Sequence, residues 1–408
     1  MNKVNAVMVG GLFDENGISA FARPVLFGTA GDAMRDALPD AVEACFFAHD
    51  DRESAVAGAQ DIALDAANRF ASLAALPESE HVLVLAAPFA LAEEDALFHL
   101  AETHLNTGYG VSVLSAEQQG FDAEGQPLPR DSRCYAAMFT WDMLKKALAS
   151  GADTLDGLVA AAVAAGAQKG IAITNKIYVI CDGTAAFMAQ VEMMQRVNYG
   201  LIKKGVQIFD LTSTYIAPDA DIAPGATILP GCHIRPGCKV GAGAVIGPNT
   251  ILEKAEIGAG TTVNNSQVYE STVGSNTTVG PFAYIRPQSV VGDGCRIGDF
   301  VELKKSTIGN GTKVPHLSYV GDADLGGHTN IGGGTITANY DGVHKHLTTI
   351  GSNVHVGAGN LFVAPVEVGS GVTTGAGSVV RHDVPDDSMV YSENTQHVVE
   401  GWKPEWER

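Results

Sequence analysis

The sequence has no uninterrupted run of 18 or more apolar residues, which argues against a membrane-spanning helix. Its first residues, MNKVNAVMVGG, carry one Lys and an apolar stretch too short for a secretory signal, so we expect a cytoplasmic protein. The six cysteines include no C-x-x-C pair. We interpret Cys232 and Cys238, six residues apart, as small core or corner residues rather than as a disulfide or a zinc site.

Positive charge is also scarce, with 26 Lys and Arg against 46 Asp and Glu and a formal net charge of −20. A surface of this sign repels phosphate backbones and anionic lipids, which argues against nucleic acid or a membrane as a partner. Any local cluster of Lys and Arg is therefore more informative, because the surrounding field opposes the binding of anions.

Glycine, by contrast, is abundant, and it accompanies a repeat with a period of six in segments such as IAPGAT and ILPGCH. The repeated aliphatic positions are Ile216, Ile222, Ile228, Ile234, Val240 and Ile246. Helices and strands have side-chain periods of 3.6 and 2, so neither explains this spacing. A period of six predicts a parallel β-helix, in which each hexapeptide forms one face of a triangular coil and its aliphatic residue points inward.

The coil is predicted from about residue 206 to 390, with roughly ten turns of about 18 residues each. Its rhythm breaks at residues 338–347 (ANYDGVHKHL), where we expect a loop to leave the scaffold and to carry function. Residues 392–408, which include Trp402 and Trp406, fall outside the repeat. We expect them to pack against the coil or against a neighbouring chain.

The first half of the chain alternates strand and helix patterns. Strands are predicted at residues 4–10, 81–88 and 110–115, and helices at 54–77, 93–103, 144–149 and 154–165. This alternation predicts an α/β domain with a Rossmann-like sheet over residues 1–185. An amphipathic helix over residues 186–205 is predicted to connect it to the coil domain, residues 206–408. Its apolar stripe consists of Val191, Met194, Val197 and Leu201.

Side chains that can bind an anion, transfer a proton or donate hydrogen bonds to a ligand are concentrated between residues 286 and 345. They are Arg286, Lys304, Lys305, His316, Tyr319, Asn330, Asn339, Tyr340 and Lys345. On a coil of about 18 residues, Arg286 and Lys304 stack on adjacent turns. Stacked cations favour a bound anion such as a phosphate, and a solvated charged face is the alternative. A neutral imidazole at His316 can take a proton from an ammonium that must become a nucleophilic amine, and a structural histidine is the alternative.

Longer segments of the second half carry a family resemblance. Between Gly280 and Trp402 the chain reads PFAYIRP, GDFVELKKSTIG, HLSYVGDADLG, TNIGGGTITANYDGVHKH and FVAPVEVGSGVTTGAGSVV. This part resembles the acetyltransferase domain of the bifunctional N-acetylglucosamine-1-phosphate uridylyltransferase / glucosamine-1-phosphate acetyltransferase family. The resemblance is specific, because HLSYVGD and NYDG are not general features of hexapeptide repeats. It implies a left-handed β-helix, a homotrimer with active sites between subunits, and acetyl transfer from acetyl-CoA to the amine of glucosamine 1-phosphate.

The same resemblance implies roles for individual residues. His316 matches the general base. The positions that match contacts to the acceptor sugar and its phosphate are Arg286, Lys304, Tyr319, Asn330, Asn339 and Lys345. The positions that match the acetyl-CoA site are Tyr340, Ala358 and Ala376. No metal is implied at this transferase site.

Two departures from the family fall on the donor side. Ala358 stands where the family usually has Ser, and Glu393 stands where it usually has an Arg that contacts a phosphate of CoA. A carboxylate at that position repels the donor, so the resemblance defines the acceptor better than the donor.

The first half resembles the nucleotidyltransferase domain of the same family in the order of its elements. Its Gly-rich loop reads GGLFDENGISAFARP, with Asp14 and Glu15 where phosphates should bind. The family's lysine falls near Pro24, its magnesium-binding Asp falls at Pro88, and only Asp182 in VICDGT could serve as the second metal ligand. We therefore expect a degenerate nucleotidyltransferase fold that makes no UDP-sugar.

Three functions remain open from the sequence. The first is a glucosamine-1-phosphate N-acetyltransferase with a silent first domain. The second is an acyltransferase for a different amino-sugar, which could be nucleotide-linked. The third is a non-catalytic regulatory homologue. The joint presence of Arg286, Lys304, His316, Asn339 and Lys345 argues against the third.

Overall fold

The computed structural model describes residues 3–91, 95–116, 134–174, 177–393 and 395–407. The chain divides into two compact units, Met1–Arg196 and Val197–Arg408. Within the described residues, we find no helix with both the length and the apolar character that a membrane span requires.

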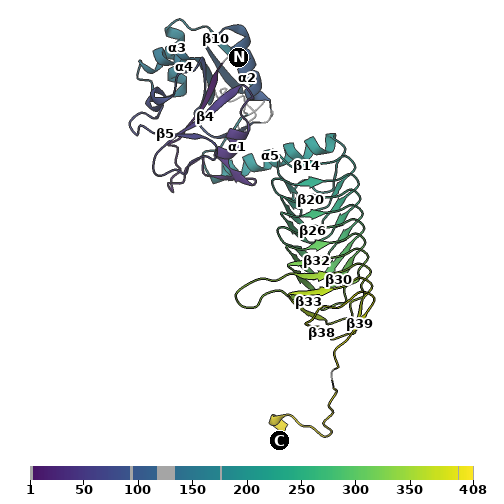
Figure 1. Ribbon diagram of the computed structural model, residues 1–408. Helices are drawn as coiled ribbons and strands as arrows, with labels where there is room; N and C mark the ends of the chain where they lie inside the picture. Colours follow the sequence, from purple (N-terminus) through teal and green to yellow (C-terminus); the bar gives the residue numbers. More distant parts are fainter. Residues whose placement is uncertain (1–2, 92–94, 117–133, 175–176, 394, 408) are drawn as a thin grey trace. The chain divides into compact units, whose positions relative to one another are not determined.

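The first unit is built on a seven-stranded sheet with the order β10-β8-β9-β6-β1-β4-β5 (Figure 1). The strands are β1 (Val4–Val9), β4 (Val42–His49), β5 (Gln60–Ala63), β6 (His81–Leu85), β8 (Val111–Ala116), β9 (Ala136–Thr140) and β10 (Lys169–Thr174). β9 runs antiparallel to both of its neighbours, and the other pairs are parallel. Short two-stranded sheets are formed by β2 (Pro24–Val25) with β3 (Gly28–Thr29), and by β7 (Phe89–Leu91) with β11 (Ile177–Val179).

Helices cover both faces of this sheet. Alternate residues of β1 and β6 therefore pack in two different hydrophobic cores. Val7 and Val84 pack with the 3₁₀ helix η1 (Arg69–Ala75), α3 (Trp141–Leu148) and α4 (Leu155–Ala164). Met8 and Leu83 pack with α1 (Ala30–Asp36) and α2 (Ala96–Thr107). This period of two is the pattern of a strand buried on both sides.

The predicted helix over residues 54–77 is wrong. That segment forms β5 and η1, and the carboxylate of Asp65 accepts hydrogen bonds from the backbone of Ala67 and Asn68. Asn68 in turn caps η1 through the N–H of Phe70. Such local side-chain bonds compete with the α-helix despite the many alanines. The predicted helix at residues 93–103 corresponds to α2, and Glu93 lies outside the described residues.

His104 is a buried titratable group in the first unit. Its side chain is held between the Oγ of Ser112 and the Nδ1 of His81, each at 3.1 Å. Burial, with a smaller contribution from the charge of His81, lowers the pKa of His104 to about 4. The imidazole is therefore neutral in the folded protein at neutral pH.

We expect the first unit to lose stability in mild acid through His104. The ordinary pKa of 6.5 applies to the unfolded chain, so the stability is complete above pH 6.5 and is lost as the pH falls towards 4. The expected loss is about 3 kcal/mol. Urea unfolding followed by Trp141 fluorescence, with Trp402 and Trp406 replaced by Phe, measures it. His104→Asn should flatten the pH dependence, whereas His99→Asn, an exposed histidine of α2, should not. An unchanged dependence in His104→Asn would contradict this account.

The helix α5 (Gly183–Lys203) spans the boundary between the two units. Near its start, Ala186 and Ala189 are buried with Val25 and Ile180 of the first unit. Near its end, Leu201 belongs to the core of the second unit.

The second unit is a left-handed parallel β-helix with three faces, whose coils are stacked one on another (Figure 1). Face 1 contains β12 (Gln207–Ile208), β15 (Thr227–Ile228), β18 (Val245–Ile246), β21 (Thr262–Val263), β24 (Thr278–Val279), β27 (Arg296–Asp299) and β30 (Lys313–His316). Face 2 contains β13 (Tyr215–Ile216), β16 (His233–Ile234), β19 (Ile251–Glu253), β22 (Gln267–Tyr269), β25 (Tyr284–Ile285), β28 (Glu302–Lys304), β31 (Tyr319–Gly321), β33 (Ile336–Ala338), β35 (Leu361–Val363) and β38 (Val379–Val380). Face 3 contains β14 (Asp221–Ile222), β17 (Lys239–Val240), β20 (Glu256–Ile257), β23 (Thr272–Val273), β26 (Val290–Val291), β29 (Thr307–Ile308), β32 (Ala323–Leu325), β34 (Thr348–Ile350) and β36 (Val366–Val368).

The interior of the coil confirms the six-residue pattern. All six aliphatic residues from Ile216 to Ile246 are buried, with at most 4% exposure. Cys232 and Cys238 are free thiols in the same core, as the sequence predicts. The chain passes from face 1 to 2 to 3 in every coil, and we name the turns between them corner 1–2, corner 2–3 and corner 3–1.

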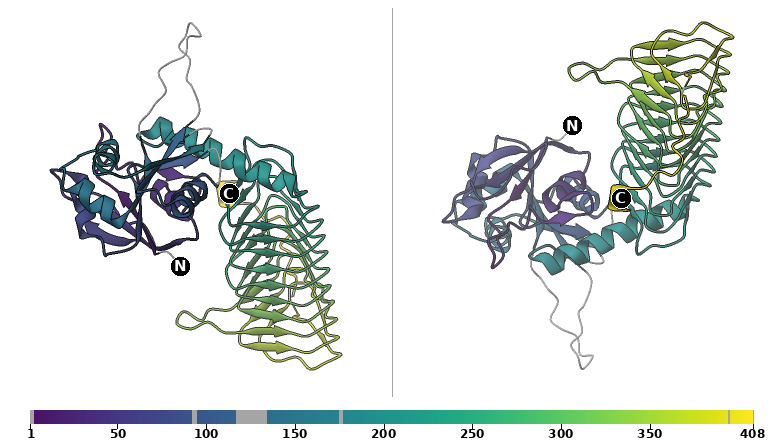
Figure 2. Two further views of the ribbon diagram at one scale, coloured as in Figure 1. Left: turned by 90° about the horizontal axis from the view of Figure 1, so that it is seen from above. Right: turned by 90° about the horizontal axis from the view of Figure 1, so that it is seen from below.

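A loop leaves the coil between β33 and β34, at the predicted residues 338–347 (Figures 1 and 2). It folds back on itself through an antiparallel bridge between Tyr340 and Lys345. Beyond β39 (Met389–Val390), the tail ends in the 3₁₀ helix η2 (Glu405–Glu407). Trp402 and Trp406 are 63% and 85% exposed, so they are not packed against the coil of their own chain.

Candidate active site

The cationic residues of the second unit gather at corner 2–3. Arg286 directly follows β25 and Lys304 ends β28. These strands pair in parallel with Tyr284 opposite Glu302 and Ile285 opposite Leu303, which places Arg286 and Lys304 on adjacent coils of one column. The next coil contributes Asp322.

Carboxylates of the same chain already partner both cations. Arg286 Nη1 lies 2.8 Å from Glu302 Oε1, and Lys304 Nζ lies 3.2 Å from Asp322 Oδ2. The repulsion between these stacked cations is therefore already reduced within the chain, and the binding of a phosphate by Arg286 and Lys304 stays a prediction. The side chains of Lys304 and Asp322 are only 19% and 12% exposed, so this ion pair is largely buried within corner 2–3.

Asp322 connects Lys304 to two polar residues of the predicted site. The amide of Asn339 donates to Asp322 and lies 3.5 Å from the hydroxyl of Tyr319. Lys304, Tyr319 and Asn339 are thus brought together around Asp322, a residue that the sequence analysis did not identify. Its spacing of 18 from Lys304 is the signal that could have identified it.

Lys345 joins this cluster from the loop. Close approach of the Lys304 side chain lowers the pKa of Lys345, and the charges of Lys304 and Arg286 act in the same direction. The same contact, together with Asp322, raises the pKa of Lys304. Lys345 Nζ also lies 5.5 Å from the ring centroid of Tyr340, whose hydroxyl donates to the carbonyl of Gly342 at 2.6 Å. A dianionic ligand would relieve the repulsion between Lys304 and Lys345.

His316 lies at a different place, at corner 1–2, where β30 ends. Its Nδ1 is 2.9 Å from Oδ1 of Asp299, which ends β27 on the coil above. Asp299 was not identified from the sequence, because the two residues are 17 apart rather than 18. A Cβ added to Gly333 would lie 3.4 Å from the Cβ of His316, so Gly333 occupies the same column one coil below.

Ala358 and Ala376 continue along corner 1–2. Gly377 donates its backbone N–H to the carbonyl of Ala358, which shows that the two alanines occupy adjacent coils. Both are exposed, as is Glu393 in the tail. Asn330 lies on face 1, bridged to Lys313 and to His355. The base candidate and the alanines therefore share one corner, and the cation cluster occupies the other end of face 2.

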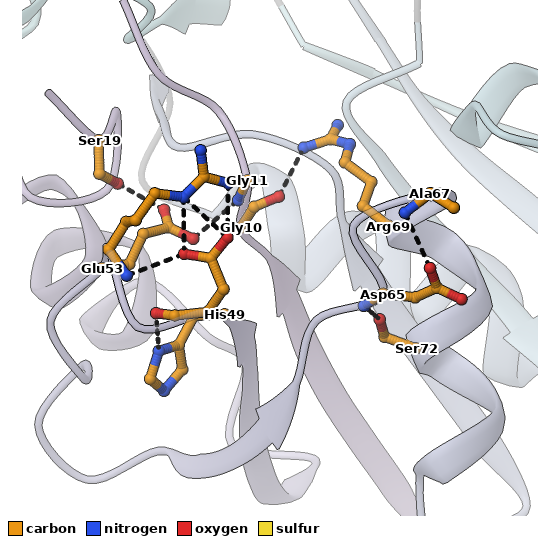
Figure 3. Close-up of polar contacts among 11 residues, drawn as sticks. Gly10, Gly11, Ser19, His49, Glu53, Asp65, Ala67, Arg69 and Ser72 are labelled. Atoms are coloured by element: carbon orange, nitrogen blue, oxygen red, sulfur yellow. Dashed lines mark hydrogen bonds and ion pairs between the residues drawn. The ribbon is translucent and has the colours of Figure 1, made fainter. Parts of the chain in front are cut away.

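The first unit has a separate polar cluster, at the carboxyl end of β1 (Figure 3). Glu53 is 7% exposed and accepts hydrogen bonds from the hydroxyl of Ser19 at 2.5 Å and from the N–H of Gly11 at 2.8 Å. A Cβ added to Gly10 would lie 2.3 Å from the Glu53 carboxylate, so this carboxylate packs directly against the backbone of the glycine loop. Arg69 donates to the carbonyls of Val9, Gly10 and Ala86, which ties the ends of β1 and β6 together.

Asp14 is not a free negative charge in this loop. Its Oδ1 accepts the N–H groups of Asn16 and Ile18, both at 2.9 Å, and its carboxylate forms an ion pair with Arg23. Repulsion of phosphate by Asp14 is thus weaker than the sequence suggests. Two carboxylates thus occupy backbone donors of the loop, since Glu53 accepts the N–H of Gly11 and Asp14 accepts those of Asn16 and Ile18. Asp182, the remaining metal-ligand candidate, accepts the N–H of Ala185 at the start of α5.

Comparisons with known proteins cover both units. Residues 219–254 and 270–305 match the family described as "Bacterial transferase hexapeptide (six repeats)". A protein described as "Bifunctional protein GlmU" from Bifidobacterium longum (strain NCC 2705) is 42% identical over 358 residues, which cover 80% of this chain and 78% of that protein. The protein of the same description from Bifidobacterium adolescentis is 59% identical over 214 residues, which cover 52% of this chain and 46% of that protein. Among solved structures, a 2-C-methyl-D-erythritol 4-phosphate cytidylyltransferase from Thermus thermophilus aligns over 46% of this chain and 97% of its own, with 18% identity and a TM-score of 0.36.

Proposed function

The chain belongs to the family of the bifunctional protein GlmU, and we propose that its second unit transfers an acetyl group from acetyl-CoA to the amine of glucosamine 1-phosphate. The observation that carries this proposal is the arrangement of face 2. A histidine with a free ring nitrogen stands at one edge of this face, and a cluster of cations suited to a phosphate stands at the other.

In the proposed reaction, Nε2 of His316 accepts a proton from the acceptor ammonium. The amine then attacks the thioester carbonyl, a C–N bond forms, the C–S bond breaks, and CoA leaves as the thiolate. Arg286, Lys304 and Lys345 bind the sugar phosphate, while Tyr319, Asn330 and Asn339 orient the sugar. Tyr340, Ala358 and Ala376 line the donor site, where the small alanine side chains leave room for the donor. A cytoplasmic location is part of this proposal.

We further propose that the active protein is a homotrimer whose sites are completed by neighbouring chains. Face 2 supports this, because it carries exposed apolar residues that include Tyr284, Ile336 and Val379, at 39–46% exposure. The corresponding outward positions of face 3 are mostly charged or polar, for example Asp221, Lys239, Glu256, Asp324 and Glu367. Exposed apolar surface of this kind is suited to burial against a second chain.

Corner 1–2 supports the same assembly. Phe282, Phe300 and Leu317 are 52–65% exposed and adopt left-handed φ angles of 43–60°. This conformation costs a residue with a Cβ about 1–2 kcal/mol. Gly, Asn, His and Asp occupy the corresponding positions of corner 3–1. The rings of Phe282 and Phe300 are stacked at 5.3 Å, and coverage of this apolar column by another chain would offset the strain.

We propose that the first unit retains the family fold without uridylyl transfer. Pro88 has no side chain that can hold a metal, and Glu53 takes a backbone donor of the loop that follows β1. A carboxylate in that position opposes the binding of a nucleotide phosphate in the same place.

The acceptor is tested by measuring release of free CoA with glucosamine 1-phosphate and, separately, with UDP-glucosamine. Turnover with glucosamine 1-phosphate alone is the expected result. Turnover with UDP-glucosamine alone would assign a nucleotide-linked acceptor, and turnover with neither would favour a non-catalytic homologue.

Lys304→Ala should raise the KM for glucosamine 1-phosphate about 10- to 150-fold, the equivalent of a charge-assisted bond of about 1.5–3 kcal/mol. The KM for acetyl-CoA should change little. Lys239→Ala, which removes an exposed lysine paired with Glu256 on face 3, is the matched control. Light scattering should give about 130 kDa, three times the chain mass of 42.5 kDa, for each variant. An effect confined to acetyl-CoA would show that the cluster binds the donor instead.

A further inference from the structure

We propose that Asp299 is the positioning residue of the base, and that it holds His316 in the tautomer that can accept a proton. This inference rests on the proposed acetyl transfer. It is carried by the 2.9 Å contact between Asp299 Oδ1 and His316 Nδ1. Because a carboxylate accepts hydrogen bonds, the proton in this contact lies on Nδ1, and Nε2 keeps its lone pair.

The backbone fixes the two residues opposite each other. β27 and β30 pair in parallel with Asp299 in register with His316, and the N–H of Leu317 donates to the carbonyl of Asp299 at 2.9 Å. A Cβ on the preceding residue, Gly298, would lie 1.8 Å from the carbonyl oxygen of Pro315. Only glycine permits this close approach of the two strands, and the approach sets the distance between the acid and the imidazole.

Asp299 is ionised at neutral pH. The hydrogen bond from His316 lowers the pKa of Asp299, and the charges of His316 and Arg296 act in the same direction. Arg296 lies opposite Lys313 at the start of the same strand pair, so cations flank the acid on its own face. An ionised carboxylate favours the imidazolium that forms when His316 accepts the proton of the acceptor ammonium.

The carboxylate thus contributes in two ways to the same step. It fixes the orientation of the ring, and it stabilises the positive charge that develops on the ring as the C–N bond forms. It touches neither the sugar nor the thioester in this scheme. Its removal should therefore change the rate of the chemical step and leave both binding sites as they are.

The test compares Asp299→Asn with the unchanged protein and with Asp324→Asn, a matched exposed aspartate on face 3. An amide at position 299 can donate to Nδ1 and so favour the tautomer that has its proton on Nε2. We expect kcat to fall about 10- to 100-fold, with the KM of both substrates unchanged within about twofold. In a His316→Ala background, the same substitution should have no further effect, because the two residues act as one unit.

Asp299→Ala, measured in the same way, provides a second variant, with light scattering and thermal unfolding as checks on assembly and folding. A normal kcat in a folded Asp299→Asn protein would overturn the proposal. An equal loss of kcat in the His316→Ala background would also overturn it, because Asp299 would then act independently of His316. Normal turnover of the His316→Ala single variant would instead refute the base on which the proposed function depends.

Discussion

Replacing His316 with Ala is expected to lower kcat about 10²- to 10⁴-fold, which is the usual contribution of a general base. The amine of the acceptor is protonated at neutral pH and cannot attack a thioester until the proton is removed. His316 is suited to this task because Asp299 occupies one ring nitrogen at 2.9 Å and the other remains available. The KM values should change little, since the residues proposed to bind the phosphate at corner 2–3 are unaffected.

His328→Asn is the matched control for this measurement. His328 is exposed at corner 3–1, away from both edges of face 2, and Asn tolerates its left-handed φ of 56°. Release of CoA at saturating acetyl-CoA and glucosamine 1-phosphate gives kcat for both variants. Near-normal turnover of His316→Ala would mean that another group, or the solvent, removes the proton.

The β-helix could be predicted from the sequence because its pattern is local. Each aliphatic residue from Ile216 to Ile246 is followed, six residues later, by another that occupies the same core, so no long-range information is needed. The interruption at residues 338–347 was predicted for the same reason, since a break in a strict period is visible in the sequence itself.

The first unit was harder to predict because tertiary contacts and side-chain caps decide its local structure. The alanines of residues 54–77 favour a helix, but Asp65 and Asn68 bind nearby backbone N–H groups and the segment forms β5 and η1. The strand β9 lies inside the sheet, between β6 and β8, and the sequence analysis did not identify it. Its antiparallel pairing depends on partners far away in the chain.

The site shows a similar division. The stacking of Arg286 on Lys304 followed from a spacing of 18, but their acidic partners were not predicted. Glu302 is two residues before Lys304 on the same strand, so it reaches Arg286 diagonally across coils. Asp299 reaches His316 because the coil between them has 17 residues rather than 18. A fixed period cannot identify contacts that depend on these small departures from it.

No synthesis of UDP-N-acetylglucosamine is expected from UTP and N-acetylglucosamine 1-phosphate, with either magnesium or manganese. Uridylyl transfer needs a divalent cation held by carboxylates and a loop of backbone donors around the phosphates. Position 88, which the family resemblance matches to the magnesium-binding Asp, is a proline, and the N–H of Gly11 is already bonded to Glu53. Release of pyrophosphate measures this reaction, and acetyl transfer by the same preparation shows that the protein is folded. Robust pyrophosphate release by the full chain would show that other residues have replaced the family's metal site.

A chain that begins at Ala186 should keep acetyl transfer at a normal rate and should still assemble. It retains most of α5, including Leu201, which is buried in the core of the coil, and all the residues proposed for the transferase site. The apolar surface of face 2 and the column from Phe282 to Leu317 are also retained, so the contacts proposed between chains are preserved. Loss of acetyl transfer on truncation would instead show that the first unit holds the acceptor or the assembly, because none of the proposed transferase residues is missing from the shorter chain.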